Sequence, residues 1–342
     1  MSIPELTVTA LGTRYSGKST FLLGMFDVLS TGLHGYFTFT EDPDDGVDLQ
    51  DAWDLLMDEG QVPDPTTQNK CYRFVFNHGL TPLVTIDWMD YRGAALDDRG
   101  DSSPDVAELR ERLNGSDSIY LVLDGGTLAE WLDDPKRLSV VQRRLKVQAM
   151  SALVLTAVRH RMEQDLPMPS LVVVITKSDL LRAPGRTVAQ ALSAVVRDLP
   201  TLLPVVFAKG VTALVCPVKV GDFGKDSAVP IAVEDIDPVG LHRPMVFSLM
   251  RHLTEGLGAR KVKIDGAESQ RSAVTQQLAA LNQGFLAVFR GRRTAELRDI
   301  AAAHQQTIDD QGKRHSADIG LIDALGREIA GHPVIRSGEL TL

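Results

Sequence analysis

The fold of this chain is decided by a short stretch near its start, Gly12-Thr13-Arg14-Tyr15-Ser16-Gly17-Lys18-Ser19. An apolar run at residues 6–11 precedes this stretch, and a second apolar run from Phe21 to Leu29 follows it. The pattern predicts a strand, a phosphate-binding loop and a helix, because two glycines let the backbone approach the phosphates and the loop amides point at them. Lys18 would neutralise the β and γ phosphates, Ser19 would offer its hydroxyl to Mg²⁺, and Thr20 would lie near the α-phosphate.

The bulk composition is that of a globular chain. Its 342 residues are 44% hydrophobic and carry a formal net charge of −9, which is enough for a packed core and disfavours nucleic-acid partners. Cys71 and Cys216 are isolated, and the N-terminus lacks a signal-peptide pattern. We therefore expect a reduced, cytoplasmic protein with no transmembrane segment.

Apolar runs alternate with helical patterns along most of the chain. We predict strands at 6–11, 71–76, 82–88, 118–123, 170–175 and 212–218, and helices at 18–29, 104–113, 136–163, 187–198 and 241–256. This order predicts an α/β fold with a mostly parallel sheet of six strands. The connection through Asn77-His78-Gly79 is so short that it predicts a hairpin, and hence one antiparallel strand at an edge.

Two regions depart from this alternation. Residues 41–70 are acidic and then rich in proline, so we expect a mobile surface segment with only a short helical stretch at 53–57. Beyond residue 258 the apolar residues recur at helical spacing, interrupted by His304, Gln311 and His315. We therefore predict two domains, an α/β domain at 1–258 and a helical hairpin at 259–342 that packs on itself or on a partner.

Two further motifs extend the predicted site. The strand at 82–88 leads into Asp90-Tyr91-Arg92-Gly93, where Asp90 could bind Mg²⁺ through water and the Gly93 amide could touch the γ-phosphate. The strand at 170–175 ends in Thr176-Lys177-Ser178-Asp179. The Asp179 carboxylate can accept from guanine N1–H and the 2-amino group, which adenine does not offer, while the Lys177 stem can lie over the base. Thr176 would tie this loop to the backbone of the phosphate loop.

These three motifs, in this order and with the hairpin, resemble the Ras-like P-loop GTPases of the translation-factor-related class over about residues 1–258. The resemblance implies a three-layer α/β/α fold, GTP or GDP with Mg²⁺ as ligands, and Thr66 as a switch residue that completes the Mg²⁺ shell, with Thr67 as the reserve. Val218 and Lys219 stand where the family's last guanine-binding motif is expected and would contact the base through backbone amides. The Trp53, Gly60, Pro63 and Thr66 pattern and the helical extension are similar to bacterial double-GTPase domains of conflict and signalling systems.

The sequence departs from that family at positions that matter for the reaction. Ala94 follows Gly93 where many members place a water-orienting glutamine, and Tyr15 replaces the asparagine of potassium-activated members. Arg14 and Arg92 are candidates for the positive charge that the transition state needs. The expected catalytic residues are therefore Lys18, Thr66, Gly93, Arg14 and Arg92.

Three functions follow as alternatives. The first is a regulatory GTPase with slow intrinsic hydrolysis, stimulated by a protein partner or by self-association through the switch loops and C-terminal helices. The second is a GTP-binding scaffold that barely hydrolyses GTP, which Ala94 makes plausible. The third, an ATP-dependent kinase or motor, is disfavoured because Asp179 presents the wrong pattern to adenine.

Overall fold

The computed structural model describes residues 3–33, 35–61, 69–91, 104–224, 231–282 and 291–341. The chain divides into two units, one made of Met1–Leu249 with Ile329–Leu342 and the other of Met250–Glu328. Thr66, Thr67, Arg92, Gly93 and Ala94 lie outside the described residues. In the described part, no helix is both long and apolar enough to cross a membrane.

A mixed sheet, nine-stranded over the described residues, runs through the first unit in the order β11-β10-β7-β6-β5-β1-β4-β3-β2. The five central strands, from β7 to β4, are parallel, and β3 and β10 run against them. A separate pair, β8 and β9, is antiparallel. The strands are β1 Glu5–Gly12, β2 Tyr36–Thr40, β3 Lys70–His78, β4 Thr81–Asp90, β5 Ser118–Asp124, β6 Ser170–Thr176, β7 Thr212–Pro217, β8 Lys219–Gly221, β9 Ile236–Val239, β10 Val334–Arg336 and β11 Glu339–Thr341.

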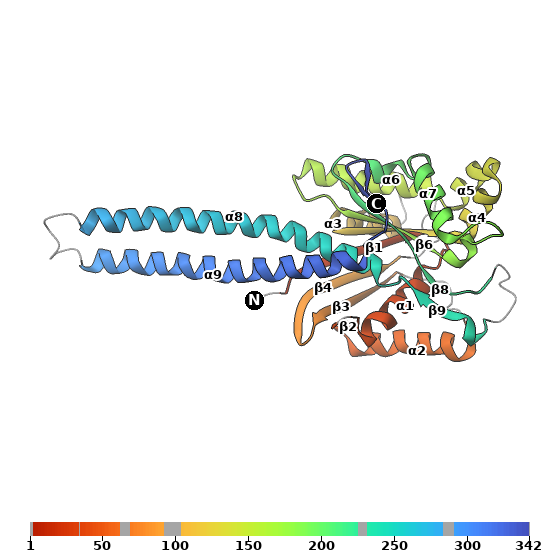
Figure 1. Cartoon of the computed structure of the whole chain (residues 1–342), viewed down its shortest axis with the longest axis horizontal. Helices are drawn as coiled ribbons and strands as arrows, with labels where there is room; N and C mark the ends of the chain where they lie inside the picture. The colour runs from red at the N-terminus through yellow and green to blue at the C-terminus, as the bar shows by residue number, and fades with distance from the viewer. Residues whose placement is uncertain are drawn as a thin grey trace. The chain divides into compact units, whose positions relative to one another are not determined.

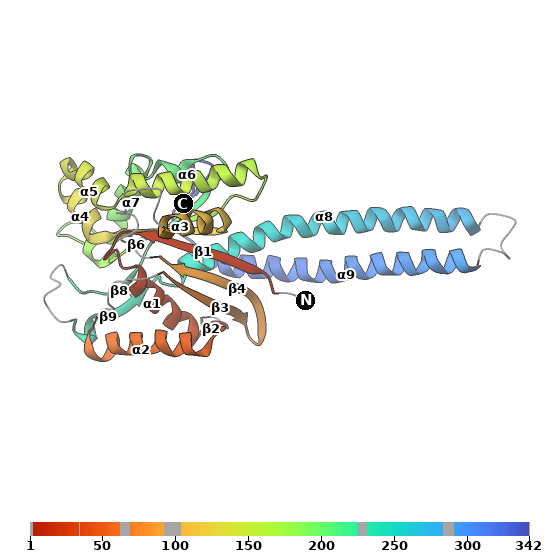
Figure 2. The same ribbon diagram turned by 180° about the vertical axis from the view of Figure 1, so that it is seen from behind.

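Helices cover both faces of this sheet, with α3, α6 and α7 on one side and α1 and α2 on the other (Figures 1 and 2). They are α1 Lys18–Thr31, α2 Pro43–Glu59, α3 Pro104–Gly115, α4 Gly125–Asp133, α5 Leu138–Arg144, α6 Val147–Glu163, α7 Val188–Leu202, α8 Arg243–Asn282 and α9 Gly291–Glu328. Short 3-10 helices are η2 Pro135–Arg137, η3 Ser178–Leu181, η4 Pro204–Phe207 and η5 Val233–Asp235.

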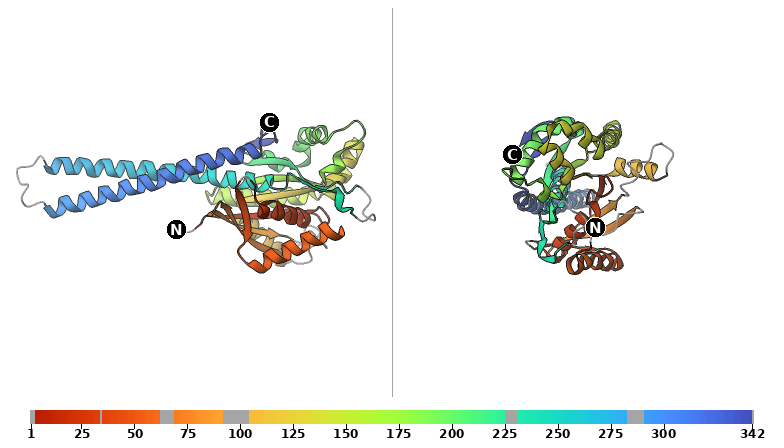
Figure 3. Two further views of the ribbon diagram at one scale, coloured as in Figure 1. Left: turned by 60° about the horizontal axis from the view of Figure 1, so that its bottom comes forward. Right: turned by 90° about the vertical axis from the view of Figure 1, so that its right-hand side faces the viewer.

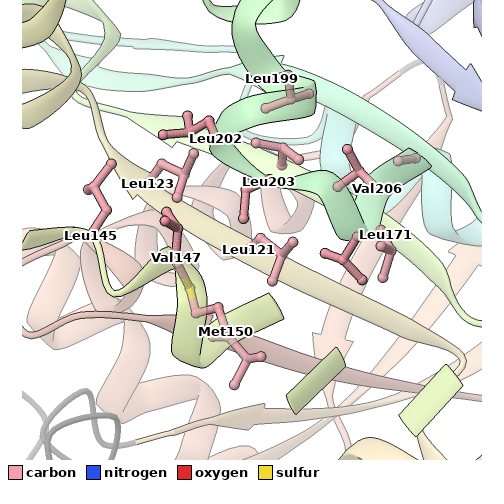
Figure 4. Packing of buried hydrophobic residues seen from close by; sticks show 14 of the residues in the cluster. Leu121, Leu123, Leu145, Val147, Met150, Leu171, Leu199, Leu202, Leu203 and Val206 are labelled. Carbon is pink, nitrogen blue, oxygen red and sulfur yellow. The ribbon is translucent and has the colours of Figure 1, made fainter. Parts of the chain in front are cut away.

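The larger core lies between the sheet and α3 to α7. Leu121 of β5 and Leu171 of β6 belong to the same buried cluster as Met150 of α6 and Leu199 of α7 (Figure 4). Each such side chain stabilises the fold by about 1.5–3 kcal/mol when fully buried. Because β5 and β6 are covered on both faces, their residues read as continuous apolar runs, which is the pattern of buried parallel strands.

The prediction of an α/β fold with a mostly parallel sheet and a C-terminal helical region is confirmed, but six strands was too few. The hairpin of β3 and β4 is antiparallel as predicted, yet β3 is not an edge strand, because β2 pairs outside it. At the other end β10 pairs with β7 and β11 pairs with β10. Strands β2, β10 and β11 are only three to five residues long, so their sequences carry too little periodicity to be recognised.

The expectation of a mobile acidic segment at 41–70 is wrong for its first half, which forms the 17-residue helix α2. Asp42 caps its N-terminus by accepting from the Asp44 amide, Pro43 occupies the first turn, and Gly60 ends it at φ +66°. Leu49, Trp53 and Leu56 are buried on its inner face. Figure 3 shows α2, in orange, at the periphery of the first unit.

Helix boundaries differ from the predictions in two further places. The helix predicted at 136–163 is broken at Lys146, which adopts φ +52° between α5 and α6. The helix predicted at 241–256 continues without a break to Asn282 as α8. The apolar pattern does not mark the break at Lys146, and the glycines at 256, 258 and 266 do not interrupt α8.

The second unit contains α8 from Met250 onward and the whole of α9, two long helices that lie side by side (Figures 1 and 3). Arg260 and Asp318 form an ion pair between them. Among the described residues of this unit only Leu253, Ala267 and Leu325 are buried hydrophobic residues. Helix α9 ends at Glu328, and the last residues of the predicted second domain instead form β10 and β11 of the sheet.

Candidate functional site

The loop from Gly12 to Ser19 joins the end of β1 to the start of α1. A Cβ at Gly12 would lie 2.7 Å from Ser16 Oγ and 2.9 Å from the Val122 carbonyl oxygen, so only glycine fits there. Gly17 has φ +83°, a left-handed conformation that glycine adopts without strain, and α1 begins at the next residue. The two glycines therefore allow a tight loop whose end is a helix N-terminus, the place where backbone amides favour an anion.

Lys18 is buried inside this loop, with 7% of its surface exposed. Its Nζ donates to the carbonyl oxygens of Gly12 at 3.1 Å and Thr13 at 3.4 Å. Burial lowers the pKa of Lys18, and the charge of Asp90 opposes that effect. An ammonium held on neutral carbonyls in a desolvated loop is poised to bind an anion that supplies the missing charge.

Ser19 and Asp90 bring the loop to the end of β4. The Ser19 hydroxyl donates to Asp90 Oδ2 at 2.8 Å. Asp90 is the last residue of β4, is buried, and pairs in register with Ala10 of β1. A hydroxyl and a carboxylate are both hard oxygen donors, so this donor set fits Mg²⁺. Thr20, the next residue of α1, lies in its first turn.

The segment 176–179 begins at the last residue of β6 and contacts the Gly12–Ser19 loop. The Thr176 hydroxyl lies 2.6 Å from the carbonyl oxygen of Ser16, which is the tie that the sequence predicts. The Lys177 Nζ donates to the Tyr15 carbonyl oxygen at 2.9 Å and to Asp124 Oδ2 at 2.5 Å. Two side chains of this segment therefore hold the backbone of the Gly12–Ser19 loop.

Asp179 lies in η3 and is partly buried. Burial raises the pKa of its carboxyl above the ordinary value of 3.8; its own amide and that of Leu180 lower it, and the charge of Asp222 raises it further. Burial and the charge of Asp222 both disfavour the ionised form of Asp179. A ligand that donates hydrogen bonds to this carboxylate would stabilise the ionised form.

Val218 and Lys219 adjoin the same segment but are already engaged. The Val218 amide donates to the Ile175 carbonyl oxygen at 2.8 Å, and its own carbonyl accepts from the Ser178 amide at 3.1 Å. The Lys219 Nζ pairs with Asp222 at 3.0 Å and with Asp237 at 2.9 Å. The Val218 amide is therefore used within the fold, and a contact of this segment with a base stays a prediction.

Arg14 and Tyr15 form the outer turn of the loop. Tyr15 is 67% exposed and has φ +63°, which for a residue with a side chain costs about 1–2 kcal/mol. The Arg14 guanidinium lies over the Tyr15 ring, 4.9 Å from its centroid. The Arg14 guanidinium thus packs on the neighbouring ring, and its predicted part in hydrolysis stays a prediction.

Sequence reasoning missed two residues that shape this site, Asp124 and Gly125. Asp124 Oδ1 accepts from the Thr127 amide at 2.7 Å and caps α4, while Oδ2 holds Lys177. A Cβ at Gly125 would lie 2.4 Å from the Thr176 carbonyl oxygen and 2.6 Å from that of Lys177. The sequence signal was present, since Asp124-Gly125-Gly126 directly follows a strand and opens a helix.

The site therefore gathers the carboxyl ends of β1, β4, β5 and β6 into one region, with the Gly12–Ser19 loop at its centre. In comparisons with models of protein families and with curated proteins, no family model and no curated protein matches this chain.

Proposed function

We propose that this chain is a P-loop GTPase, a guanine-nucleotide switch that hydrolyses GTP slowly to GDP and phosphate. The observation that carries the proposal is the pair of contacts that meet on one loop, Ser19 to Asp90 at 2.8 Å and Thr176 to Ser16 at 2.6 Å. They join three motifs from distant parts of the sequence, as expected of residues that serve a single ligand. The buried Ser16 hydroxyl, which has no hydrogen-bond partner within the described residues, is consistent with a polar ligand there.

Each residue has a role in this proposal that its position supports. Lys18 and the amides that follow Gly17 neutralise the phosphates, and Ser19 and Asp90 hold Mg²⁺, which screens phosphate charge when bound. Asp179 accepts from the two donors of guanine, and Lys177 keeps its stem beside the base while its ammonium stays on Tyr15 and Asp124. Thr66, Gly93 and Arg92 keep their proposed parts in switching and hydrolysis.

Base preference is the first test. We expect the purified chain to bind a fluorescent GDP much more tightly than the matching ADP, with Mg²⁺ present in both titrations. Asp179→Asn should weaken GDP binding at least about tenfold, because the amide places a donor opposite a donor of guanine. Asp198→Asn, a partly buried residue of α7 whose carboxylate pairs with Arg197, is the matched control. Equal affinity for ADP and GDP, or an unchanged Asp179→Asn variant, would reject guanine recognition.

Hydrolysis is the second test, and it separates a switch from a scaffold. We expect a slow single-turnover rate that rises with protein concentration or with a partner, and a faster rate in Ala94→Gln. A chain that binds GTP but shows no turnover in either form would instead be the hydrolysis-deficient scaffold.

A further inference from the structure

A hollow lies beside the Gly12–Ser19 loop, on the side of α4. It has a volume of about 300 Å³, within the lower range of small-molecule sites, and lies among the loop, the start of α4, the junction of α5 with α6, and Lys177. Helices α4, α5 and α6 belong to the same unit as the loop. The hollow is distinct from the pair Ser19 and Asp90, which does not line it.

The lining is strongly cationic. Arg14, Arg144, Lys146 and Lys177 face one carboxylate, Asp124, so four positive charges less one negative give +3 in a chain of net charge −9. Asp124 is already occupied, since one oxygen caps α4 and the other holds Lys177. The residues that line the hollow therefore carry a net positive formal charge.

Arg144 has one further partner, Glu130, at 2.8 Å. That pair is solvent-exposed, with the Arg144 side chain 52% and the Glu130 side chain 30% exposed. Exposed pairs of this kind contribute little to stability and leave guanidinium donors for a second acceptor. Arg144 can therefore bind an anion in the hollow while it keeps its ion pair with Glu130.

The backbone of the lining is unusual as well. Among the described residues, five non-glycine residues have positive φ, and three of them line this hollow, namely Tyr15 at +63°, Lys146 at +52° and Lys177 at +49°. Such conformations cost free energy and persist where the surroundings require them, often at binding sites. At Lys146 this conformation separates α5 from α6 and places the lysine at the junction of the two helices.

We propose that this hollow binds a small phosphate-bearing anion, at a site separate from the one proposed for the phosphates of a nucleotide. Arg14, Arg144 and Lys146 supply the charge, and Thr127 in the first turn of α4 supplies a hydroxyl beside the positive end of the helix dipole. Since Arg14 and Tyr15 belong both to this hollow and to the loop, the anion contacts the segment that holds Lys18.

The test uses inorganic pyrophosphate and a full-length chain whose loop lacks its ammonium, Lys18→Met. We expect this variant to bind one pyrophosphate by calorimetry, with an affinity that falls as salt rises. Adding Arg144→Gln and Lys146→Gln should weaken that binding at least about tenfold, and adding Lys209→Gln, an exposed lysine elsewhere, should leave it unchanged.

Two results would overturn the proposal: no binding of pyrophosphate to Lys18→Met, or equal weakening by the Lys209→Gln control. Far-ultraviolet circular dichroism and thermal unfolding establish that each variant is folded before its titration. The outcome is independent of guanine recognition, because the loop is disabled in every arm and no nucleotide is present. Failure of GDP binding by the wild type would reject the proposed function and leave this site standing.

Discussion

The hydroxyl of Thr176 lies 2.6 Å from the carbonyl oxygen of Ser16, across 160 residues of sequence. Both groups are buried, and the same hydroxyl is 3.1 Å from the Leu123 carbonyl oxygen. This contact joins the end of β6 to the Gly12–Ser19 loop and so couples the segment proposed to read the base to the segment proposed to hold the phosphates.

Thr176→Val tests that coupling while keeping the side-chain shape. We expect a loss of about 1–3 kcal/mol in the free energy of unfolding, because buried carbonyl oxygens lose their donor, and GDP affinity should fall by about tenfold. Urea denaturation and a fluorescent-GDP titration measure the two effects. Thr156→Val, whose exposed hydroxyl bonds only to its own helix, is the control and should change neither quantity.

Lys18→Met should abolish nucleotide binding without weakening the nucleotide-free chain. Burial lowers the pKa of Lys18, which means that the folded state disfavours its charged form. Removing that charge should leave the free energy of unfolding equal to or above that of the wild type, with exposed Lys209→Met as the control. A fall of more than about 2 kcal/mol in urea denaturation would instead assign Lys18 a structural role.

Affinity for GDP should fall as the pH is lowered from 7 toward 5. Burial raises the pKa of Asp179 above 3.8, and guanine requires the ionised carboxylate, so protonation competes with binding at a higher pH than for an ordinary aspartate. The stability of the nucleotide-free chain should depend on pH in the opposite direction. The raised pKa of Asp179 stabilises the folded state below pH 3.8, and this contribution is lost as the pH rises through the pKa of Asp179 in the folded state.

The measurement is the dissociation constant of fluorescent GDP across that range, for the wild type and for Asp179→Asn. The variant has no carboxyl to titrate, so its weaker binding should show a flatter pH dependence. A wild-type affinity that is constant from pH 7 to pH 5 would contradict the role of Asp179.

Gly125→Ala should displace the segment that follows β6. Its new Cβ would lie 2.4 Å from the Thr176 carbonyl oxygen, which is closer than real Cβ contacts allow. We expect GDP affinity to fall by about tenfold or more, because Thr176 and Lys177 move away from the loop. Gly115→Ala is a matched control, since nothing lies within 4 Å of its Cβ, and GDP affinity should be unaffected. Equal affinities in the two variants would show that this close packing is dispensable.

Much of the fold could be read from local pattern. The strands predicted at 6–11, 118–123 and 170–175 are present within two residues, because their apolar runs are long and bounded by turn residues. Only residues 53–57 of helix α2 were predicted as helical although its cap signals were in the sequence, since the density of aspartates outweighed Leu49, Trp53 and Leu56. Strands β2, β10 and β11 were missed because short strands are stabilised by pairing with neighbours that the local sequence does not name.

The candidate site shows the same division. The sequence by itself determined the Gly12–Ser19 loop and the placement of Asp90 and Thr176 at strand ends, because glycine conformations and strand ends are local properties. The motif also predicted the tie between Thr176 and the loop, although the contact itself spans 160 residues. Only the tertiary structure decided that Asp124 holds Lys177, that Gly125 must lack a side chain, that the Val218 amide is already used, and that four cations converge beside the loop. Those facts depend on distances between segments that the parallel sheet brings together, and no spacing along the chain encodes them.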